Sequence, residues 1–245
     1  MAQDLAQAIQ TIKEKEWVDL THTFGPDSPH FSAFDDAEFI TLYTHDDGFS
    51  AQSFTFPGQY GTHIDAPIHF VRDTRFLDEL LLKELLLPLV VIDVSKECET
   101  NHDFTLSVED ILAFEETHGK IESGTFVALR TDWSKRWPDK DAFNNQDDDG
   151  NNRIPGWGLE ALKFLFEERS IQAVGHETYD TDSSIEFQKN GELLGEYYVL
   201  DQDTFQVELL NNLDKLPAKG AFIANFVAKP EKASGFPVRS FAILP

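Results

Sequence analysis

The order of predicted strands and helices most limits how this chain can fold. Apolar, β-branched runs are typical of buried strands, and longer segments with one apolar face are typical of helices. Strands are predicted at 17–20, 87–94, 126–129, 171–175, 205–210, 221–226 and 240–244, and helices near 6–15 and at 77–86, 107–119 and 158–169. A hairpin is predicted at 38–43 and 53–56, so alternation of strands and helices begins only after an all-β opening. We expect a mixed α/β fold, a β-rich sheet or barrel with helices packed outside, in a single domain spanning residues 1–245.

Composition restricts the partners and the location. The chain carries 44 Asp and Glu against 20 Lys and Arg, and its formal charge of −24 repels polyanions, so we expect no nucleic-acid partner. Nothing near the N-terminus resembles an export signal, and charges interrupt the apolar stretch 80–94 before it reaches the roughly 20 residues of a membrane helix. We expect a cytoplasmic protein that stays off the membrane and acts on a small molecule. The single cysteine, Cys98, excludes a zinc site of clustered thiolates.

Residues suited to metal binding are concentrated in the segment 59–69. On an extended chain, residues two apart face the same side, so His63 and Asp65 are predicted to point together. A histidine nitrogen with a carboxylate oxygen suits zinc, manganese or iron(II). Gly61 allows the backbone to turn with positive φ before this pair, and His69 follows four residues after Asp65. The spacing indicates a metal site, and the alternative is that these are ordinary polar residues of a loop.

This segment resembles the signature of the metal-dependent cyclase family, which includes kynurenine formamidases, isatin hydrolases and some lactone hydrolases. The family pattern is His-x-Gly-Thr-His-x-Asp-x-Pro-x-His. The chain departs from it at the first position, where Gln59 replaces His, and matches it at Gly61, Thr62, His63, Asp65, Pro67 and His69. Weaker similarity covers nearly the whole chain, from Asp-Leu-Thr at 19–21 to Gly-Phe-Pro-Val-Arg at 235–239. The resemblance implies a swivelling β/β/α-like fold and assembly as a homodimer or homotetramer.

The resemblance also implies roles for individual residues. The positions that match the family's ligands to its first metal are Gln59, His63 and Asp65, and Gln59 would bind through its amide oxygen. An oxygen ligand in place of an imidazole makes the site harder, which favours manganese over zinc. The alternative for Gln59 is a hydrogen-bond donor behind the ligands.

A second metal is not expected from the sequence. Kynurenine formamidases hold it with the shared Asp and with a downstream His and Glu. At the places expected for those two residues, this chain offers Lys189 or Asn190, and then Asp201 or Gln202. We therefore predict one divalent metal ion per chain, manganese or zinc.

The predicted chemistry is hydrolysis. A bound divalent ion polarises a carbonyl group and lowers the pKa of its water toward about 7. His69 resembles the family's acid/base residue, and proton transfer by an imidazole contributes roughly 10² to 10⁴ in rate. We predict a hydrolase that opens a cyclic amide or lactone, or cleaves an N-acyl amide such as an N-formyl arylamine. Two alternatives stay open: a metal-dependent lyase or isomerase, and a non-catalytic metal- or small-molecule-binding protein.

Residues at strand ends and in loops are further candidates for substrate contact. His176 and Glu177 end a predicted strand, where α/β folds often open into a cleft. His176 is predicted to polarise the substrate or relay protons, and the alternative is a structural histidine tied to a carboxylate. For His22 and His30, in an early loop, we favour surface placement over substrate contact. The three tryptophans around the acidic loop 139–153 either line an aromatic pocket or pack in the core.

Overall fold

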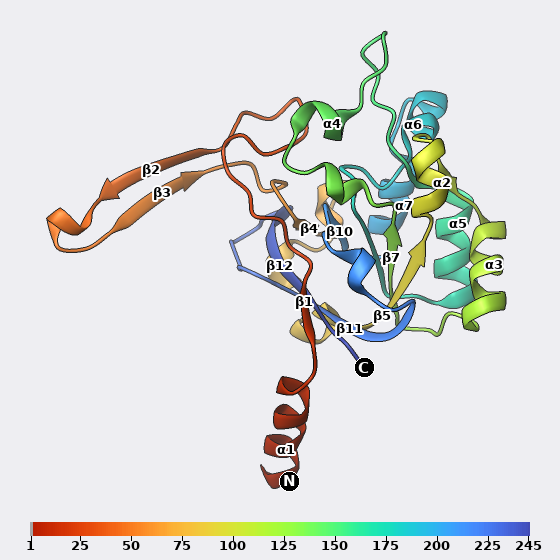
Figure 1. Cartoon of the computed structure of the whole chain (residues 1–245), viewed down its shortest axis with the longest axis horizontal. Coiled ribbons are helices and arrows are strands. Elements are labelled where there is room, and N and C mark those ends of the chain that lie inside the picture. The colour runs from red at the N-terminus through yellow and green to blue at the C-terminus, as the bar shows by residue number, and fades with distance from the viewer. Residues whose placement is uncertain (1) are drawn as a thin grey trace.

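A computed structural model describes residues 2–245 and shows a closed β-barrel with helices packed against one side (Figure 1). The strands are β1 (Trp17–Asp19), β2 (Glu38–Tyr43), β3 (Ala51–Thr55), β4 (His63–Asp65), β5 (Leu86–Asp93), β6 (Thr105–Leu106), β7 (Phe126–Arg130), β8 (Gly156–Trp157), β9 (Ala173–His176), β10 (Gln206–Glu208), β11 (Lys219–Val227) and β12 (Gly235–Ile243). The α-helices are α1 (Ala2–Lys13), α2 (Ser95–Thr100), α3 (Val108–His118), α4 (Lys140–Asn144), α5 (Leu159–Lys163), α6 (Ser184–Asn190) and α7 (Leu194–Asp201). The predicted fold class, a β-rich barrel with helices outside, is confirmed.

The barrel closes because β4 pairs on both sides. Around the ring the order is β12, β11, β5, β7, β9, β10 and β4, and β4 then pairs with β12, while β1 extends the sheet beside β12. The neighbours β5, β7, β9 and β10 run parallel, and the remaining pairs are antiparallel. Parallel strands need long crossovers, and helices supply them here. The carboxyl ends of these four strands therefore meet at one end of the barrel.

Alternate residues of the barrel strands enter two separate cores. Leu89 of β5 and Phe126 of β7 belong to the core that fills the barrel. Their sequence neighbours Val90 and Val127 belong to a second core, which also contains helical residues such as Ile111 of α3. Both faces of these strands are buried, which explains why their sequences are continuously apolar rather than alternating.

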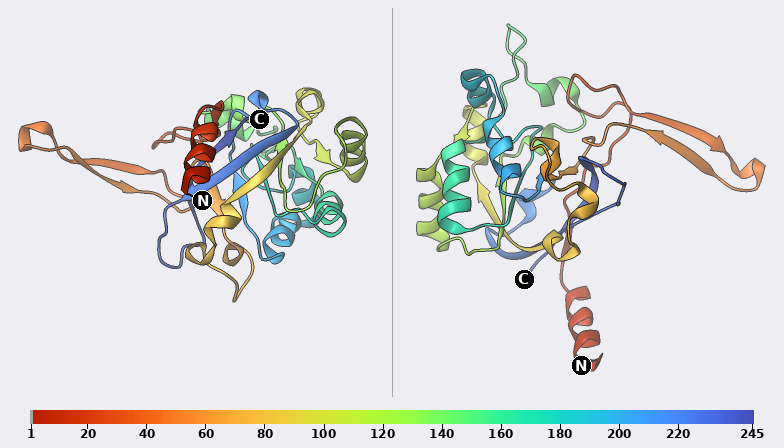
Figure 2. Two further views of the ribbon diagram at one scale, coloured as in Figure 1. Left: turned by 90° about the horizontal axis from the view of Figure 1, so that it is seen from below. Right: turned by 180° about the vertical axis from the view of Figure 1, so that it is seen from behind.

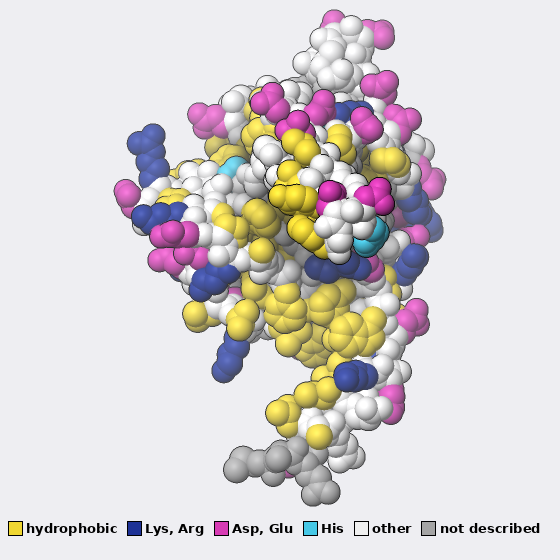
Figure 3. All heavy atoms as spheres, turned by 90° about the vertical axis from the view of Figure 1, so that its left-hand side faces the viewer, with side chains coloured by type: hydrophobic (Ala, Val, Ile, Leu, Met, Phe, Trp, Pro, Cys, Tyr) yellow, Lys and Arg dark blue, Asp and Glu magenta, His cyan; other side chains and the backbone are white. Residues whose placement is uncertain are grey.

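Two segments project from the barrel. The hairpin of β2 and β3, which we call the arm, extends far from the body on one side, and α1 extends in another direction (Figures 1 and 2). The arm exposes large apolar side chains, namely Ile40, Leu42, Tyr43, Phe49 and Phe54. Below it, hydrophobic side chains gather on the barrel (Figure 3). Trp17 on β1 and Phe222 and Phe226 on β11 are exposed, and Trp17 stacks on Phe241 of β12. We call these four residues the apolar face.

The helices differ most from the sequence-based prediction. The helix predicted at 107–119 is present as α3, which a Ser107–Asp110 capping box begins. The helix predicted at 158–169 is α-helical only to Lys163 and continues as a π-helical turn. The loop predicted at 139–153 begins with α4, and α6 and α7 were not predicted, since such short helices show little periodicity. None of the described helices is long and apolar enough to cross a membrane, and the cytoplasmic location stays a prediction.

Candidate functional site

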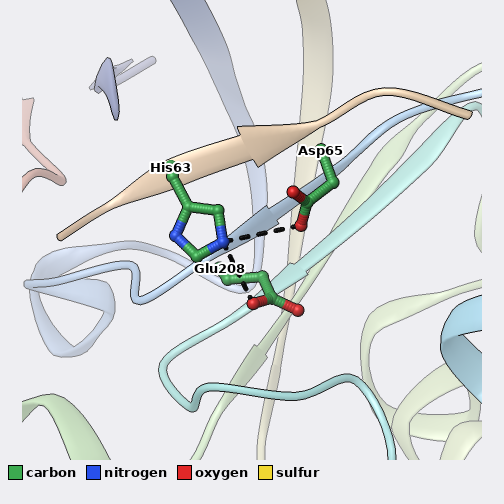
Figure 4. Close-up of side chains that lie close together, drawn as sticks. All are labelled: His63, Asp65 and Glu208. Atoms are coloured by element: carbon green, nitrogen blue, oxygen red, sulfur yellow. Dashed lines mark ion pairs between the residues drawn. The ribbon is translucent and has the colours of Figure 1, made fainter. Parts of the chain in front are cut away.

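The short strand β4 carries the predicted metal-binding residues in the barrel wall. It pairs antiparallel with β10 on one side and with β12 on the other, so both of its edges are hydrogen-bonded. In this register His63 lies opposite Glu208, and Asp65 lies opposite Gln206 and Gly235. Side chains two apart on a strand share a face, and directly opposite side chains are neighbours. His63, Asp65 and Glu208 therefore converge, as Figure 4 shows, and the first two lie together as predicted.

The His63 ring has one nitrogen available for a ligand. Its Nδ1 lies 2.9 Å from the carbonyl oxygen of Gly61, which fits an Nδ1–H donor and leaves the Nε2 lone pair free. Gly61 itself has a φ of 62°, a left-handed conformation that favours glycine. Nε2 is buried without a hydrogen-bond partner and lies 3.5 Å from Asp65 Oδ2 and 3.2 Å from Glu208 Oε2. A lone pair facing two carboxylates is repulsive unless a proton or a metal cation lies between them.

The electrostatics of this centre favour positive charge. Burial lowers the pKa of His63, but the carboxylates of Asp65 and Glu208 outweigh burial and hold that pKa well above its usual value. Burial raises the pKa of Asp65, and His63 and then His69 bring it down to about 2. For Glu196, burial and then repulsion from Glu208 raise the pKa well above its usual range. The centre attracts either a proton on His63 or a divalent ion that displaces it.

Two overlapping sets of side chains have the arrangement of metal ligands. One consists of His63, Asp65 and Glu208, the other of Asp65, His69 and Glu196, and the ligand atoms of each set lie within 4.8 Å of one another. In the second set, His69 Nε2 lies 3.9 Å from Asp65 Oδ1 and 3.8 Å from Glu196 Oε1. The first set is buried throughout and contains the unpartnered nitrogen. It therefore fits a metal ion better than the second.

Gln59 lies behind Asp65. Its amide nitrogen donates to Asp65 Oδ1 over 3.1 Å and to Ser234 Oγ over 3.2 Å, and lies 3.4 Å from His69 Nδ1. The space for these groups exists because residue 235 is glycine: a Cβ there would lie 2.4 Å from the Gln59 amide and 2.6 Å from Asp65 Oδ1. Gln59 therefore acts here as a hydrogen-bond donor behind the ligands, which was the alternative given for it from the sequence. Its role as a metal ligand stays a prediction.

Two buried side chains support Glu208. Gln206 Nε2 donates to Glu208 Oε1 over 3.0 Å and lies 3.4 Å from Asp65 Oδ2, while Thr181 Oγ1 donates to Gln206 Oε1 over 2.7 Å. His176 is fully buried, neither of its ring nitrogens has a hydrogen-bond partner, and its Nε2 lies 3.4 Å from Glu208 Oε1. This contact matches the alternative predicted for His176, a histidine tied to a neighbouring carboxylate.

Glu177 lies away from this centre. Successive residues of a strand point to opposite faces, so the residue after His176 faces elsewhere. Its carboxylate accepts hydrogen bonds from the Thr131 backbone N–H over 2.7 Å and from Ser134 Oγ over 2.6 Å. Burial raises the pKa of Glu177 to about 7. Glu177 thus holds the segment after β7, and its contact with substrate stays a prediction.

A cavity of about 180 Å³ opens beside the metal-binding set. Charged and polar side chains form one part of its wall, namely His30, Gln59, His63, His69, Asp180, Glu196 and Glu208. Aromatic and aliphatic side chains form the rest, namely Phe31, Phe34, Phe70, Tyr179, Leu193 and Leu209. A further cavity of about 360 Å³ shares Phe31, Tyr179 and Asp180 with it, so the two form one cleft. An apolar pocket with a few convergent polar groups is the usual form of a small-molecule site.

Several residues lie elsewhere than predicted. His22 is buried and stacks on Trp137, and the side chain of His30 is 8% exposed and lines the cleft, so their predicted surface placement is wrong. Trp133 and Trp157 pack in cores and line neither cavity, which confirms the packing alternative for them.

Glu196 and Glu208 were not predicted from the sequence. Lys189 on α6 and Asp201 at the end of α7 are both exposed, so the places considered for a second metal are wrong. Glu196 and Glu208 have the same separation in the sequence and do reach the centre. Glu208 lies between the apolar residues Val207 and Leu209, and an acidic residue inside a predicted buried strand was the available signal.

Comparison with known proteins places the chain in a family. The Cyclase family pattern matches residues 18–183. An isatin hydrolase from Roseibium aggregatum is 34% identical over 246 residues, covering 95% of this chain and 93% of that protein. A crystal structure of an isatin hydrolase bound to the product analogue thioisatinate matches with a TM-score of 0.93 and 31% identity, over 100% of this chain and 99% of that one. Isatin hydrolase A from Ralstonia solanacearum matches with a TM-score of 0.92 and 31% identity, over 100% and 97% of the two chains. The chain belongs to the Cyclase family.

Proposed function

We propose that this chain is a metal-dependent hydrolase that opens a cyclic amide or lactone. One observation carries the proposal: the buried, unpartnered Nε2 of His63 faces two carboxylates beside a cavity whose wall also holds His69. Similarity to a protein named isatin hydrolase, and to one bound to a product analogue, supports ring opening as the reaction.

The donors available suit a divalent ion. His63, Asp65 and Glu208 would hold one manganese or zinc ion, with Gln59 as a further candidate ligand if its amide oxygen turns inward. When bound there, the ion supplies Lewis-acid polarisation of a carbonyl and a lower pKa for water. Gln206 donates a hydrogen bond to the Glu208 carboxylate and His176 Nε2 lies 3.4 Å from it, so both would orient this ligand, as partners of metal ligands commonly do.

His69 is the proposed acid and base. It sits on the 3-10 turn Pro67–His69 directly after β4, and 25% of its side chain is exposed toward the cleft. It would take a proton as the oxygen of water bonds to the carbonyl carbon, and deliver a proton to the ring nitrogen or oxygen as its bond to that carbon breaks. The product is an open-chain carboxylic acid with a free amine or hydroxyl. Occupation of the second ligand set would engage His69 Nε2, so this role favours a single ion.

The first test is metal content by elemental analysis, on the purified protein and on His63→Ala, with the exposed His45 of the arm mutated to Ala as a matched control. A panel of cyclic amides, lactones and N-formyl arylamines, assayed with manganese or zinc, follows. We expect about one metal per chain in the wild type and the control, loss in His63→Ala, and metal-dependent turnover. Equal metal in all three proteins would refute the ligand assignment, and metal binding without any turnover would identify a binding protein instead.

We propose in addition that the chain assembles with a second copy of itself. An isolated two-stranded hairpin is marginally stable in water, yet the arm projects without contact to the barrel along most of its length (Figure 1). Its exposed Ile40, Leu42 and Phe54 and the apolar face on the barrel are two uncovered surfaces of like chemistry. Light scattering after size exclusion should show a dimer or tetramer, and Ile40→Ser with Leu42→Ser should shift it toward monomer. A monomeric wild type at micromolar concentration would contradict the proposal.

A further inference from the structure

Asp180 is the acidic side chain that joins the two cavities of the cleft. It follows β9 in the segment 177–182 and lines both the inner and the outer cavity. Among the described residues, no hydrogen bond or ion pair is formed by its carboxylate. By contrast, the nearby Asp182 carboxylate accepts the backbone N–H groups of Gly195 and Glu196 over 2.8 and 2.9 Å and so caps the start of α7. Asp182 has a structural task, whereas the acceptor atoms of Asp180 are free for a ligand.

Positive side chains do not balance Asp180. The described residues that line the two cavities include no Lys or Arg. Of the cations near the outer cavity in the sequence, Lys140 pairs with Asp36 over 2.7 Å, Arg153 pairs with Asp103, and the exposed Lys189 lies 3.6 Å from Glu186. Burial and then the carboxylates of Glu208 and Asp182 raise the pKa of Asp180 to about 7, so its carboxylate is fully ionised only above that pH. A divalent ion between Asp65 and Glu208 would offset the charge of those two carboxylates and would leave Asp180 without a paired cation.

We propose that the cleft selects neutral or cationic substrates over carboxylate-bearing ones, and that Asp180 sets this preference by accepting a hydrogen bond from a substrate N–H. The inference rests on the proposed hydrolase function and narrows its substrate class to N–H-containing amides without an acidic group. The aromatic wall of Phe31, Phe34 and Tyr179 supplies a matching apolar surface for an uncharged ring. Ring opening creates a carboxylate anion, so the same negative field favours departure of the product.

The test uses matched substrates with one scissile bond. Metal-loaded wild type, Asp180→Asn and Asp180→Ala are assayed on a neutral aryl lactam, on its lactone analogue without N–H, and on the same lactam carrying a distant carboxylate or ammonium group. The surface variant Asp201→Asn removes an equal charge away from the cleft and is the control.

For the wild type, we expect kcat/KM on the carboxylate-bearing lactam to be at least about tenfold lower than on the neutral lactam. In both Asp180 variants, we expect this difference to shrink by about tenfold. Asp180→Ala should lower kcat/KM for the lactam by about tenfold while sparing the lactone. Equal losses on lactam and lactone, or an unchanged charge preference in both variants, would overturn the proposal. If Asp180→Ala but not Asp180→Asn regained activity on the carboxylate-bearing lactam, the size of the side chain rather than its charge would explain the preference, and the proposal would be overturned.

Failure of the proposed function gives a different result. In that case the wild type turns over none of the compounds, although it binds metal. The charge preference is then measured from equilibrium binding of the same compounds to wild type and Asp180→Asn, where equal affinities for the carboxylate and neutral forms would refute the role of Asp180.

Discussion

Replacing Gly235 by alanine should disable the metal site while leaving the barrel folded. Gly235 lies on β12, directly opposite Asp65 of β4. A Cβ added there would lie 2.4 Å from Gln59 Nε2, 2.6 Å from Asp65 Oδ1 and 2.8 Å from the carbonyl oxygen of Ile64. Two of these atoms belong to residues predicted to hold the ion. The methyl group therefore pushes against the ligands themselves rather than against a flexible surface side chain.

The size of the effect follows from these distances. Ordinary contacts of a Cβ begin near 3.4 Å, so the Asp65 and Gln59 groups must each move by a substantial part of an ångström. Metal–ligand distances tolerate changes of only about 0.2 Å. We expect metal affinity to fall by about 100-fold or more, comparable with or beyond the loss of a residue that orients a ligand. Overpacking of this kind costs about 1–3 kcal/mol in the free energy of unfolding, which a barrel with two cores should survive.

Metal titration followed by calorimetry measures the metal affinity, and urea denaturation of the metal-free protein measures the free energy of unfolding. The control is Gly25→Ala, because a Cβ at Gly25 meets no atom within 4 Å and its φ is not left-handed. The control should match the wild type in metal affinity and stability. Wild-type metal affinity in Gly235→Ala would refute the reasoning, since it would show that Asp65 does not need its observed position to bind the ion.

Three further variants separate chemistry, ligand orientation and stability. His69→Ala should lower kcat by roughly 10² to 10⁴ with metal content unchanged by elemental analysis, and loss of the metal would assign His69 to the ligands instead. His176→Gln should weaken metal binding by about 10–100-fold through the freed Glu208, whereas an unchanged affinity in titration would exclude an orienting role. Burial raises the pKa of Glu177 from 4.5 to about 7, so its contribution to stability is complete below about pH 4.5 and is lost as the pH rises toward 7, by at most about 3 kcal/mol. Glu177→Gln should flatten this part of the pH dependence in urea denaturation, and an unaltered slope would contradict the assignment.

Local patterns predicted the barrel strands other than β4, and they predicted the start of the site. The pairing of His63 with Asp65 follows from the two-residue repeat of a strand, and a left-handed turn at Gly61 follows from glycine. Both depend only on neighbouring residues. The buried strands β5 and β7 were visible for the same reason, since runs such as 87–94 remain apolar on both faces.

Long-range pairing decided the features that the sequence did not reveal. Glu208 reaches His63 only because β10 lies antiparallel to β4 in a particular register, and a shift by one residue would turn it to the other face. The same limit applies to Glu177. Its position at the end of a predicted strand suggested a place in the cleft, but the sequence did not show to which face of the sheet its side chain points. His30 was expected at the surface because a loop of prolines and polar residues looks solvated, yet its ring stacks on Tyr60 at 5.0 Å.

The donor set that results bears on the choice of metal. The sequence alone offered one imidazole, one carboxylate and the Gln59 amide, and the structure adds the carboxylate of Glu208 to the same centre. Oxygen donors outnumber nitrogen, whereas the family signature supplies a second histidine at position 59. Harder oxygen ligands shift the balance from zinc toward manganese, and they also make the centre more negative. On the proposed function, such a cleft would bind its ion through carboxylates and present the unpaired carboxylate of Asp180 to the substrate, so the proposed preference for manganese and the proposed rejection of anionic substrates would have one physical origin.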